Sequence, residues 1–585
     1  MSPALFHALL FTSLVVCTLG VAWRVTAWLR MRIGPDTRSV TAGPRVRGVL
    51  ATVVSTLFGP RGLRVLGAFC LDALLLRRLF ATAPWRALAH LFVVAGFTLL
   101  VLLHALAPLV TARLFPGYQP TVEPWLFVRN LLGVMVLGGL IVLVVARWRA
   151  RSRMGLPHRP RAALFAALLG IVVATGFLLE AHKIASPRAF HRMTDTFAGA
   201  ADPAALASLR ALWAREYGVA FDVRTDAVAA DVTDAGRRLH DEACAPCHAK
   251  PASAFVSRPL AMVMAPVAGT LDAANADAWL LHLHVLACLA GLALLPFTTF
   301  LHALAAPFSL LLDAAARHSA APARPLPLAA RATRRALSLD ACVRCGMCDL
   351  DCSVATLARH LDNRELLPSH KLVATREAAG PRLREAMRRD ARALTDARRA
   401  ADGAFLCTDC GRCTRRCPVG LDLAELWDAG RGDLDAAGLP APAAWVRARP
   451  AIAWAESLAN LGDRAASAVV DASRAPLAFD RRTFSRCVQC QTCTNVCPVV
   501  AHAMDADPRS AADPGVDLTP QKVMNLLRLG LPDLALGSRM VWDCATCYQC
   551  QEHCPEGIRV ADIMCELRAW SVWRLATARD VAEQS

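Results

Sequence analysis

The chain has 585 residues, enough for three or four domains. Apolar residues make up 55 % and charged residues 19 %, which excludes both a wholly water-soluble protein and one built only of membrane spans. The formal net charge of +17 is compatible with nucleic-acid binding, but the arginines cluster beside apolar stretches, as on the cytoplasmic loops of membrane proteins. We therefore expect membrane lipid, and no nucleic acid, among the partners.

Five apolar stretches approach the roughly 20 residues that cross a bilayer as a helix. The first lacks the basic start of a signal peptide and leads directly into Arg24 and Arg30, so we expect a retained helix. The five predicted membrane helices cover residues 4–26, 88–111, 126–147, 161–181 and 278–303.

Arginines in the connecting segments predict the orientation. The segment between the first two helices is strongly basic, with Asp36 and Asp72 as its acids, and the segment 147–161 holds arginines and no acid. Such segments lie on the cytoplasmic side. The prediction is a bacterial cytoplasmic (inner) membrane protein whose N-terminus and 183–277 loop are periplasmic and whose chain after about residue 304 is cytoplasmic.

Four histidines in the second and fifth predicted helices indicate haem ligands. His284 and His302 are five full helical turns apart, about 27 Å, while His90 and His104 lie within roughly 40° of each other and about 21 Å apart. Ionisable residues within hydrocarbon are rare and usually functional. Since these helices run antiparallel, we predict one haem b held by His90 and His302 and a second by His104 and His284. His282 competes with His284 but lacks the whole-turn spacing.

The 183–277 loop contains the motif C-x-x-C-H at Cys244, Cys247 and His248. This is the covalent attachment signature of a c-type haem, and attachment occurs outside the cytoplasm, where the arginines already place the loop. The opposite axial ligand is predicted to be Met264, because a Met-Ala-Pro sequence downstream is typical of methionine ligands. The alternatives that remain open are Met262, His240 and His191.

Sixteen of the 22 cysteines fall in four runs spaced C-x₂-C-x₂-C-x₃-C. This spacing wraps three thiolates around one cubane while the fourth reaches the partner cluster. Structural zinc usually takes two C-x₂-C pairs with a longer spacer, so four consecutive matches favour four [4Fe–4S] clusters. Crossed ligation predicts the ligand sets Cys342, Cys345, Cys348 and Cys417; Cys407, Cys410, Cys413 and Cys352; Cys487, Cys490, Cys493 and Cys554; and Cys544, Cys547, Cys550 and Cys497.

One residue departs from the pattern of the runs. Ser353 follows Cys352, where the other three runs continue with proline. Ligation does not need that proline, so the predicted cluster remains.

Together these features predict a mainly α fold, with a five-helix transmembrane bundle and two helical ferredoxin-like modules of two [4Fe–4S] clusters each. The predicted parts are helices one to four (1–182), the periplasmic c-type haem loop (183–277), helix five (278–310), a linker rich in Ala, Pro and Arg (311–338), module 1 (339–425), a connecting helical segment (426–480), and module 2 with the tail (481–585).

The membrane part resembles the respiratory nitrate reductase gamma-subunit family, and more closely its relatives in complexes related to heterodisulfide reductase. The likeness lies in residues 72–97, in TGFLLEA (175–181) and in residues 279–308. It implies a five-helix dihaem b anchor that reacts with quinone. That family does not usually carry a c-type haem, so the loop suggests an added periplasmic contact.

The cysteine modules resemble the two-cluster domain of the C subunits of heterodisulfide reductases. Those relatives pass electrons to a partner that contains an adjacent Cys-Cys pair. This chain has no Cys-Cys dipeptide, so the resemblance implies that any such centre lies on another polypeptide.

The expected function is that of an oxidoreductase subunit for electron transfer. It would link the quinone pool or a periplasmic cytochrome c to a cytoplasmic heterodisulfide-reductase-like or flavoprotein partner, since no dinucleotide-binding fingerprint or flavin motif is present. Candidates for a quinone site are Glu180, His182 and Lys183, near the periplasmic end of helix four. The alternative is a haem and iron–sulfur conduit without a quinone site.

Overall fold

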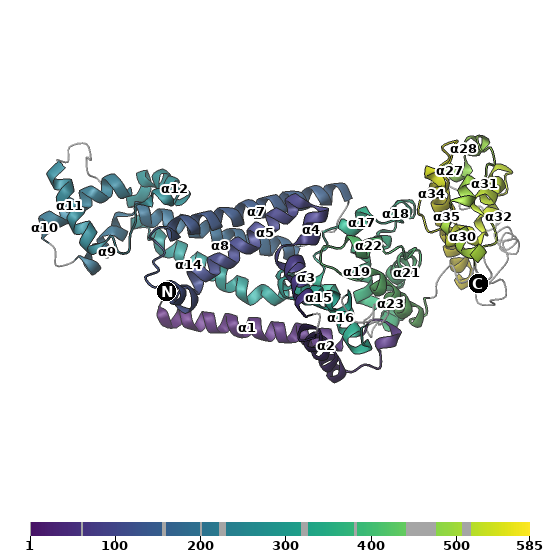
Figure 1. Cartoon of the computed structure of the whole chain (residues 1–585), viewed down its shortest axis with the longest axis horizontal. Helices are drawn as coiled ribbons and strands as arrows, with labels where there is room; N and C mark the ends of the chain where they lie inside the picture. The colour runs from purple at the N-terminus through teal and green to yellow at the C-terminus, as the bar shows by residue number, and fades with distance from the viewer. Residues whose placement is uncertain are drawn as a thin grey trace. The chain divides into compact units, whose positions relative to one another are not determined.

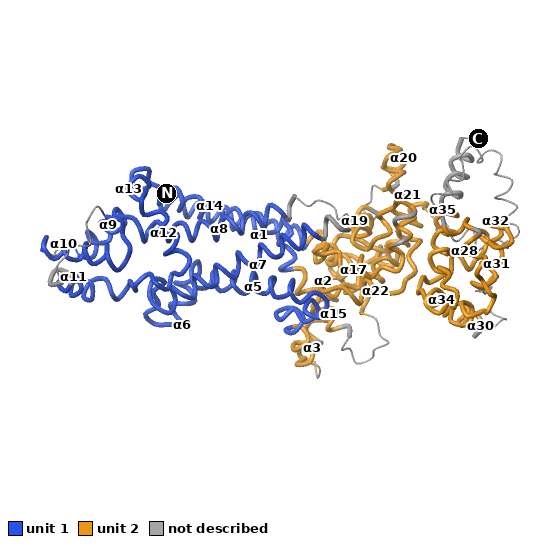
Figure 2. The backbone as a smooth tube through the Cα atoms, turned by 90° about the horizontal axis from the view of Figure 1, so that it is seen from above, with its two compact units in different colours: residues 1–25, 70–304 blue, residues 26–69, 305–585 orange. Residues whose placement is uncertain are grey.

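A computed structural model describes residues 2–59, 62–154, 160–198, 202–221, 230–317, 326–378, 383–439, 476–505 and 516–584. Every regular element within these ranges is helical, which confirms the mainly α prediction (Figure 1). The chain divides into two compact units (Figure 2). The first contains Met1–Val25 and Cys70–Leu304, and the second contains Thr26–Phe69 and Ala305–Ser585.

Five helices among the described residues are long and apolar enough to cross a membrane, in agreement with the prediction. Large apolar side chains on them, such as Phe11, Leu19 and Ile141, are exposed, as lipid contact requires. The five helices are α1 (Pro3–Arg30), α5 (Pro84–Leu100), α7 (Trp125–Met154), α8 (Pro160–Ala185) and α14 (Ala276–Leu294).

Two of these helices differ from the uniform α-helices expected. After Leu100, α5 continues as the π-helical segments η3 (Val101–Ala105) and η4 (Ala107–Thr111). The predicted helix 278–303 is interrupted, because Pro296 lacks a backbone N–H and its ring blocks the preceding turn. The chain passes through the 3₁₀ turns η9 (Leu295–Phe297) and η10 (Thr299–Leu301) before α15 (His302–Arg317) begins.

Glycines allow close approach within the bundle. A Cβ added to Gly139 of α7 would lie 2.5 Å from the Ala89 carbonyl oxygen of α5, and one added to Gly96 of α5 would lie 3.0 Å from that of Leu132. Small residues at such contacts let helix backbones pack directly on each other in membranes. Helices α7 and α8 pack similarly, with the Phe177 ring against Gly133.

The segment between α8 and α14 has a small apolar core of its own. Phe190, Leu212, Trp213 and Tyr217 are buried there together with Cys244. The helical elements of this segment are α9 (Pro187–Phe197), α10 (Pro203–Leu212), η5 (Trp213–Tyr217), α11 (Ala230–Ala243), η7 (Pro251–Ser253), α12 (Ser257–Met264), η8 (Ala265–Val267) and α13 (Ala268–Ala273).

In the second unit, the segment that follows the apolar part of α1 is held by buried charges. Arg335 of α16 (Leu328–Ala341) contacts Asp36 at 2.7 Å and Glu425 at 2.9 Å. Asp433 of α23 (Leu423–Ala436) accepts a 2.7 Å hydrogen bond from the Gly34 backbone N–H. Pairing of this kind compensates for the hydration that the charges lose on burial. The predicted cytoplasmic segment and module 1 therefore form one packed body, which also includes α2 (Ala42–Leu57) and α3 (Gly62–Phe69).

The predicted linker 311–338 is largely helical where it is described. Helix α15 extends to Arg317 and α16 begins at Leu328, while residues 318–325 lie outside the described residues. Alanine and arginine are both strong helix formers, and α16 buries most of its side chains. In the predicted connecting segment, residues 440–475 also lie outside the described residues. The same holds for Arg159 of the basic segment 147–161.

Short helices build the two cysteine-rich modules. Module 2 packs on α35 (Val560–Gln584), which buries Ile563, Met564 and Leu567. The remaining helices of both modules are α17 (Met347–Leu350), α18 (Ala355–His360), α19 (Pro368–Ala378), α20 (Leu383–Arg389), α21 (Ala391–Phe405), α22 (Arg412–Arg416), α27 (Pro476–Phe479), α28 (Arg481–Ser485), α29 (Thr492–Asn495), α30 (Pro498–Asp505), α31 (Pro520–Arg528), α32 (Pro532–Leu536), α33 (Arg539–Asp543) and α34 (Gln549–Glu552).

Substitution of Gly139 by leucine is expected to destabilise the bundle, because the new side chain meets the α5 backbone. Overpacking of this kind costs about 1–3 kcal/mol. Thermal unfolding of the detergent-solubilised protein measures the effect. Gly138→Leu is the matched control, since a Cβ at Gly138 has no atom within 4 Å. Equal melting temperatures for the two variants would contradict the close α5–α7 contact.

Candidate redox-cofactor sites

The four cysteine runs share one backbone conformation. In each run, the residue before the second cysteine and a residue between the second and third cysteines have positive φ. Module 1 uses Gly346 and Gly411 at the second of these positions, whereas module 2 uses Gln491 and Tyr548. A side chain there is strained, so the loop geometry must be imposed by what the loop surrounds and packs against. The positive-φ pairs are Arg344 and Gly346, Asp409 and Gly411, Gln489 and Gln491, and Thr546 and Tyr548.

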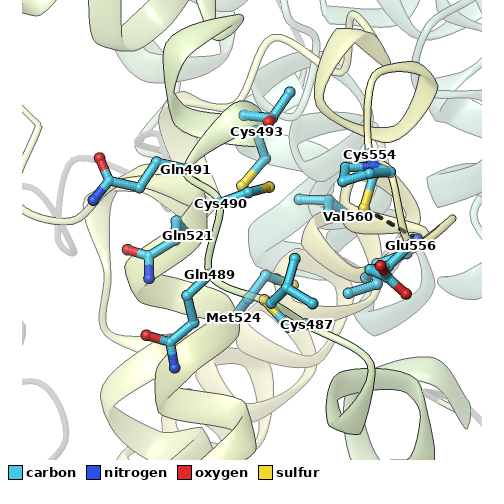
Figure 3. Close-up of a pocket in the computed structure, with 14 residues that line it drawn as sticks. Cys487, Gln489, Cys490, Gln491, Cys493, Gln521, Met524, Cys554, Glu556 and Val560 are labelled. Carbon is cyan, nitrogen blue, oxygen red and sulfur yellow. Dashed lines mark hydrogen bonds between the residues drawn. The ribbon is translucent and has the colours of Figure 1, made fainter.

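In module 2, the first three cysteines of one run lie beside the last cysteine of the other. Cys487, Cys490, Cys493 and Cys554 line one pocket together (Figure 3). The backbone N–H of Ile558 donates a 3.3 Å hydrogen bond to the Cys554 sulfur, the kind of contact that cluster thiolates accept. This is the third of the four predicted ligand sets.

The fourth predicted set lines a second pocket of module 2. Cys497 lies there with Cys544, Cys547 and Cys550, among apolar side chains such as Met540 and Met564. Arg568 of α35 is buried behind this pocket and donates hydrogen bonds to the carbonyl oxygens of Val541, Trp542 and Cys544, at 2.9, 2.9 and 2.7 Å. The C-terminal helix thereby holds the loop that carries Cys544.

In module 1, the electrostatics of the thiols reveal the same crossing. The pKa of the Cys417 thiol is raised to about 12, mainly by burial and in part by the neighbouring Cys342 and Cys345 thiols. Burial likewise raises the pKa of Cys352 to about 12, with Cys407 and Cys413 as its thiol neighbours. Cys417 is therefore close to the first run and Cys352 to the second, as the first two predicted sets require.

These buried thiol groups fit a metal cluster. Four thiolates in an apolar pocket repel each other and lose hydration, so they need a strongly bound positive centre. The indole N–H of Trp427 is buried without a well-formed hydrogen bond, although it lies close enough to the Cys413 sulfur to oppose the effect of burial on its pKa. A sulfur of a bound cluster would supply the acceptor that this N–H lacks. Among the described residues, no three His, Cys, Asp or Glu side chains converge closely enough to hold a single metal ion.

The membrane histidines face each other in the predicted pairs. The ring centres of His90 and His302 are 6.1 Å apart, and those of His104 and His284 are 6.2 Å apart. With a metal–imidazole bond of about 2 Å, two imidazoles on opposite sides of one iron have ring centres about 6 Å apart. Both pairs therefore have the separation that two axial ligands need.

Hydrogen bonds orient one imidazole of each pair. His284 Nδ1 lies 3.0 Å from the Val172 carbonyl oxygen, and His302 Nδ1 lies 2.5 Å from that of Thr299. Engagement of Nδ1 by a carbonyl orients the ring so that Nε2 can bind metal; the Cys288 sulfur lies 3.9 Å from Nε2 of His284. The Nδ1 atom of His90 is buried without a partner. The break at Pro296 was not predicted. Because the helix is interrupted there, His302 reaches His90 through the irregular turns and not through five regular helical turns after His284.

The C-x-x-C-H turn follows α11. Cys244 is buried in the core of this segment, Cys247 is exposed, and the His248 ring is 5.6 Å from that of Trp213. Thr121 holds the turn in place through its hydroxyl, which donates to the Cys247 carbonyl, and its own carbonyl, which accepts from Ala249.

The structure does not bring the favoured axial methionine to this turn. Met264 packs against Ala181, Ala185 and Ala268, which form a different apolar cluster, and Met262 is exposed. Both ring nitrogens of His240 are engaged, with the Trp213 indole at 3.2 Å and the Tyr217 hydroxyl at 2.8 Å. His191 is exposed beside Phe221.

A methionine that the sequence reasoning missed packs against the Cys244 core. Met193 of α9 is partly buried there. It lies upstream of the motif, so a search for a downstream methionine could not find it. Only the tertiary structure shows it, because α9 and the residues around Cys244 share an apolar core only in the folded segment.

The three quinone-site candidates do not share one face of α8. Residues 180 and 183 are about 60° apart around a helix, while 182 is about 200° from 180. Glu180 accepts hydrogen bonds from Asn130 at 2.8 Å and Ser257 at 2.5 Å. His182 is fully buried and lies 3.4 Å from Asp272.

Comparison with known proteins supports the iron–sulfur arm. Residues 338–421 and 483–558 match the family described as 4Fe-4S dicluster domain, so the chain carries two such domains. The chain is 34 % identical over 76 residues to the iron–sulfur C subunit of the CoB–CoM heterodisulfide reductase of Methanopyrus kandleri, covering 13 % of this chain and 33 % of the relative. It is 34 % identical over 101 residues to the C 2 iron–sulfur subunit of the Methanocaldococcus jannaschii reductase, covering 17 % and 47 %.

A third relative is the C subunit of the ferredoxin:CoB-CoM heterodisulfide reductase of Methanosarcina mazei, 33 % identical over 86 residues, which cover 15 % of this chain and 45 % of the relative. The chain thus spans between a third and a half of the length of these curated relatives. No solved structure matches it. The family match lies within residues 338–558, and the similarities to these three oxidoreductase subunits span 76 to 101 residues each.

Paired substitutions test the crossed arrangement. Each cubane binds four irons. The double variant Cys497→Ser with Cys550→Ser removes two ligands of one predicted cluster, so about four irons should be lost. Cys497→Ser with Cys493→Ser, its matched partner, should lose about eight. Iron analysis of the purified protein measures both losses. If the Cys497/Cys493 variant lost fewer irons than the Cys497/Cys550 variant, each cluster would be ligated within a single run.

Proposed function

We propose that the chain is a membrane-bound electron-transfer subunit that links the quinone pool to a cytoplasmic oxidoreductase partner. The observation that carries this proposal is the coexistence, in one polypeptide, of two imidazole pairs at about 6 Å and four groups of cysteine thiols, most of them partly or fully buried. Imidazole pairs at two depths of a membrane bundle and thiol groups in a soluble arm are what a transmembrane electron relay requires.

Two haems b, one haem c and four [4Fe–4S] clusters are the proposed cofactors. They would supply one-electron redox chemistry along the chain. His90 with His302 and His104 with His284 would hold the haems b. The C-x-x-C-H turn would hold the haem c, with Met193 in place of Met264 as its axial methionine because Met193 alone of the two contacts the Cys244 core.

The proposed location is the bacterial inner membrane, with the iron–sulfur arm in the cytoplasm. The packing of Thr26–Phe69 with module 1 in one unit supports this orientation, since the arginines of that segment predict the same side. The loop 183–277 is then periplasmic, where covalent haem attachment takes place.

The proposed cytoplasmic partner is a flavoprotein or a cysteine-rich subunit related to heterodisulfide reductase. This proposal rests on the relatives, which are subunits of CoB–CoM heterodisulfide reductases by name. Fold-level likeness alone does not determine a substrate. Purification of the complex from native membranes identifies the partner.

Glu180 and Lys183 are the residues that we retain for a quinone site. Glu180 is bonded to Asn130 and Ser257 and lies 3.7 Å from Arg129, and one of its oxygens is buried without a hydrogen bond. That oxygen, Oε1, is the one that faces Arg129, and it has no hydrogen bond that would prevent it from accepting one from a quinol hydroxyl. His182 faces Asp272 and is better explained as a packing residue.

A second candidate function is a conduit without a quinone site, which joins a periplasmic redox protein to the cytoplasmic arm. The observation that favours it is the separately folded C-x-x-C-H segment with the exposed Cys247. Addition of a quinol analogue to oxidised membranes separates the two functions. Reduction of the b-type haems that a quinone-site inhibitor blocks supports the first function, and insensitivity supports the second.

Removal of either histidine of a facing pair is expected to lose the same haem b. His104→Ala, His284→Ala and their combination should each retain one of two haems b, because one ligand cannot hold the iron firmly. His104→Ala combined with His90→Ala should retain neither. Non-covalent haem per polypeptide is the measurement, and His282→Ala is the control. Independent losses from His104→Ala and His284→Ala would contradict the pairing.

Complete loading predicts about nineteen irons per polypeptide, from four cubanes and three haems. Elemental analysis of the purified protein measures this number. Stoichiometric zinc, or full haem without cubane signals on reduction, would overturn the assignment of the cytoplasmic arm.

A further inference from the structure

The thiol group of Cys352, Cys407, Cys410 and Cys413 in module 1 has unusual polar neighbours. The first is Ser353, which replaces the proline of the other three runs. Its buried hydroxyl lies 3.3 Å from the Cys410 sulfur and 3.0 Å from the Thr408 hydroxyl. A hydroxyl there can donate to a cluster thiolate, which proline cannot do.

The second neighbour is the buried Trp427 of α23. Its side chain is 2 % exposed, and its N–H has no well-formed hydrogen bond in the described residues although it is close to Cys413. An indole nitrogen is a donor only. A buried donor without an acceptor is costly, so this orientation makes physical sense when a sulfur of a bound cluster receives the bond.

The third neighbour is a buried cation. Lys371 of α19 is 4 % exposed, and its Nζ lies 5.8 Å from the centre of the Trp427 ring. Its charge acts on both Cys352 and Cys413. Among the described residues, no carboxylate forms an ion pair with it. A buried ammonium group needs a nearby negative charge, and the thiolate-ligated cluster is the one that this site offers.

The other thiol group of module 1 has a different environment. The buried Asp349 carboxyl lies beside Cys348, with Oδ1 at 3.8 Å from the sulfur. Asp349 is itself held by the Ser369 backbone N–H at 2.8 Å. A carboxyl group contributes no positive charge to its cluster, so the two groups of one module differ in local electrostatics.

We propose that the cluster held by Cys352, Cys407, Cys410 and Cys413 has the higher reduction potential of the two in module 1, and that Lys371, Ser353 and Trp427 set it. Reduction adds one negative charge, which a buried ammonium and hydrogen bonds to sulfur stabilise. The electron comes from the other cluster of the module. This inference rests on the proposed function, because it requires clusters to be bound.

The position of this thiol group suits a resting point for an electron between the modules. Leu406, which precedes Cys407, belongs to the same apolar core as Cys497 and Cys544 of module 2, and Cys352 packs against this core. Helix α18, which begins three residues after Cys352, packs against α35. An electron held here is at the side of module 1 that adjoins module 2.

Redox titration of the full-length protein, followed by electron paramagnetic resonance, tests the proposal. Lys371→Met should lower the potential of one of the four clusters. The expected change is at least tenfold in its ratio of oxidised to reduced form at fixed ambient potential, or about 59 mV for a one-electron centre. Lys522→Met removes an exposed lysine of module 2 and should change no cluster.

Two milder variants guard against misfolding. Ser353→Ala and Trp427→Phe should each lower the potential of the same cluster by a smaller amount, and Ser353→Thr, which keeps a hydroxyl, should restore it. Unchanged potentials in protein with full cluster signals, or equal shifts in all four clusters, would overturn the inference alone. Absence of cubane signals from the unsubstituted protein would instead overturn the proposed function.

Discussion

The structure of the iron–sulfur arm depends on sixteen cysteine thiols that are gathered in groups of four, most of them partly or fully buried. Burial raises the pKa of thiols such as Cys417 and Cys352 to about 12. Without a metal cluster these thiols would therefore remain protonated. A bound metal cluster reverses this balance, because ligation replaces the proton. The strained backbone at Gln491 and Tyr548 and the Trp427 N–H, which lacks a well-formed hydrogen bond, have the same explanation. Each is costly alone and is compensated by a cluster.

The membrane bundle meets a related requirement with imidazoles. Pairs of imidazole rings lie about 6 Å apart there, and one histidine of each pair comes from an irregular stretch of its helix. His104 lies in the π-helical segment η3, and His302 begins α15 after the break at Pro296. π-helical turns are rare and frequently occur at functional sites. The irregular turns re-aim these side chains, while Gly96 and Gly139 let α5 and α7 pack at close range.

Ion pairs and hydrogen bonds help to hold the beginning of the second unit together. Arg335 joins Asp36 to Glu425, and Asp433 binds the backbone of Gly34. Networks of this kind fix geometry more than they add stability, because desolvation offsets much of the attraction. They hold module 1 against the segment that follows α1, whereas module 2 is built on the apolar face of α35.

The sequence by itself determined the number of membrane helices, the helical fold class and the iron–sulfur domains, because hydrophobic length and cysteine spacing are local properties. It also predicted which histidines face each other, since helical periodicity projects residues far apart in sequence onto one face. It could not predict the break at Pro296, the helices at both ends of residues 311–338, or the position of Met264 away from the Cys244 core. Nor could it reveal Ser353, Lys371 and Trp427 around one thiol group, which come from three segments. Only the tertiary structure decided these features, because contacts between distant segments depend on which surfaces are buried against each other in the folded chain and not on local sequence.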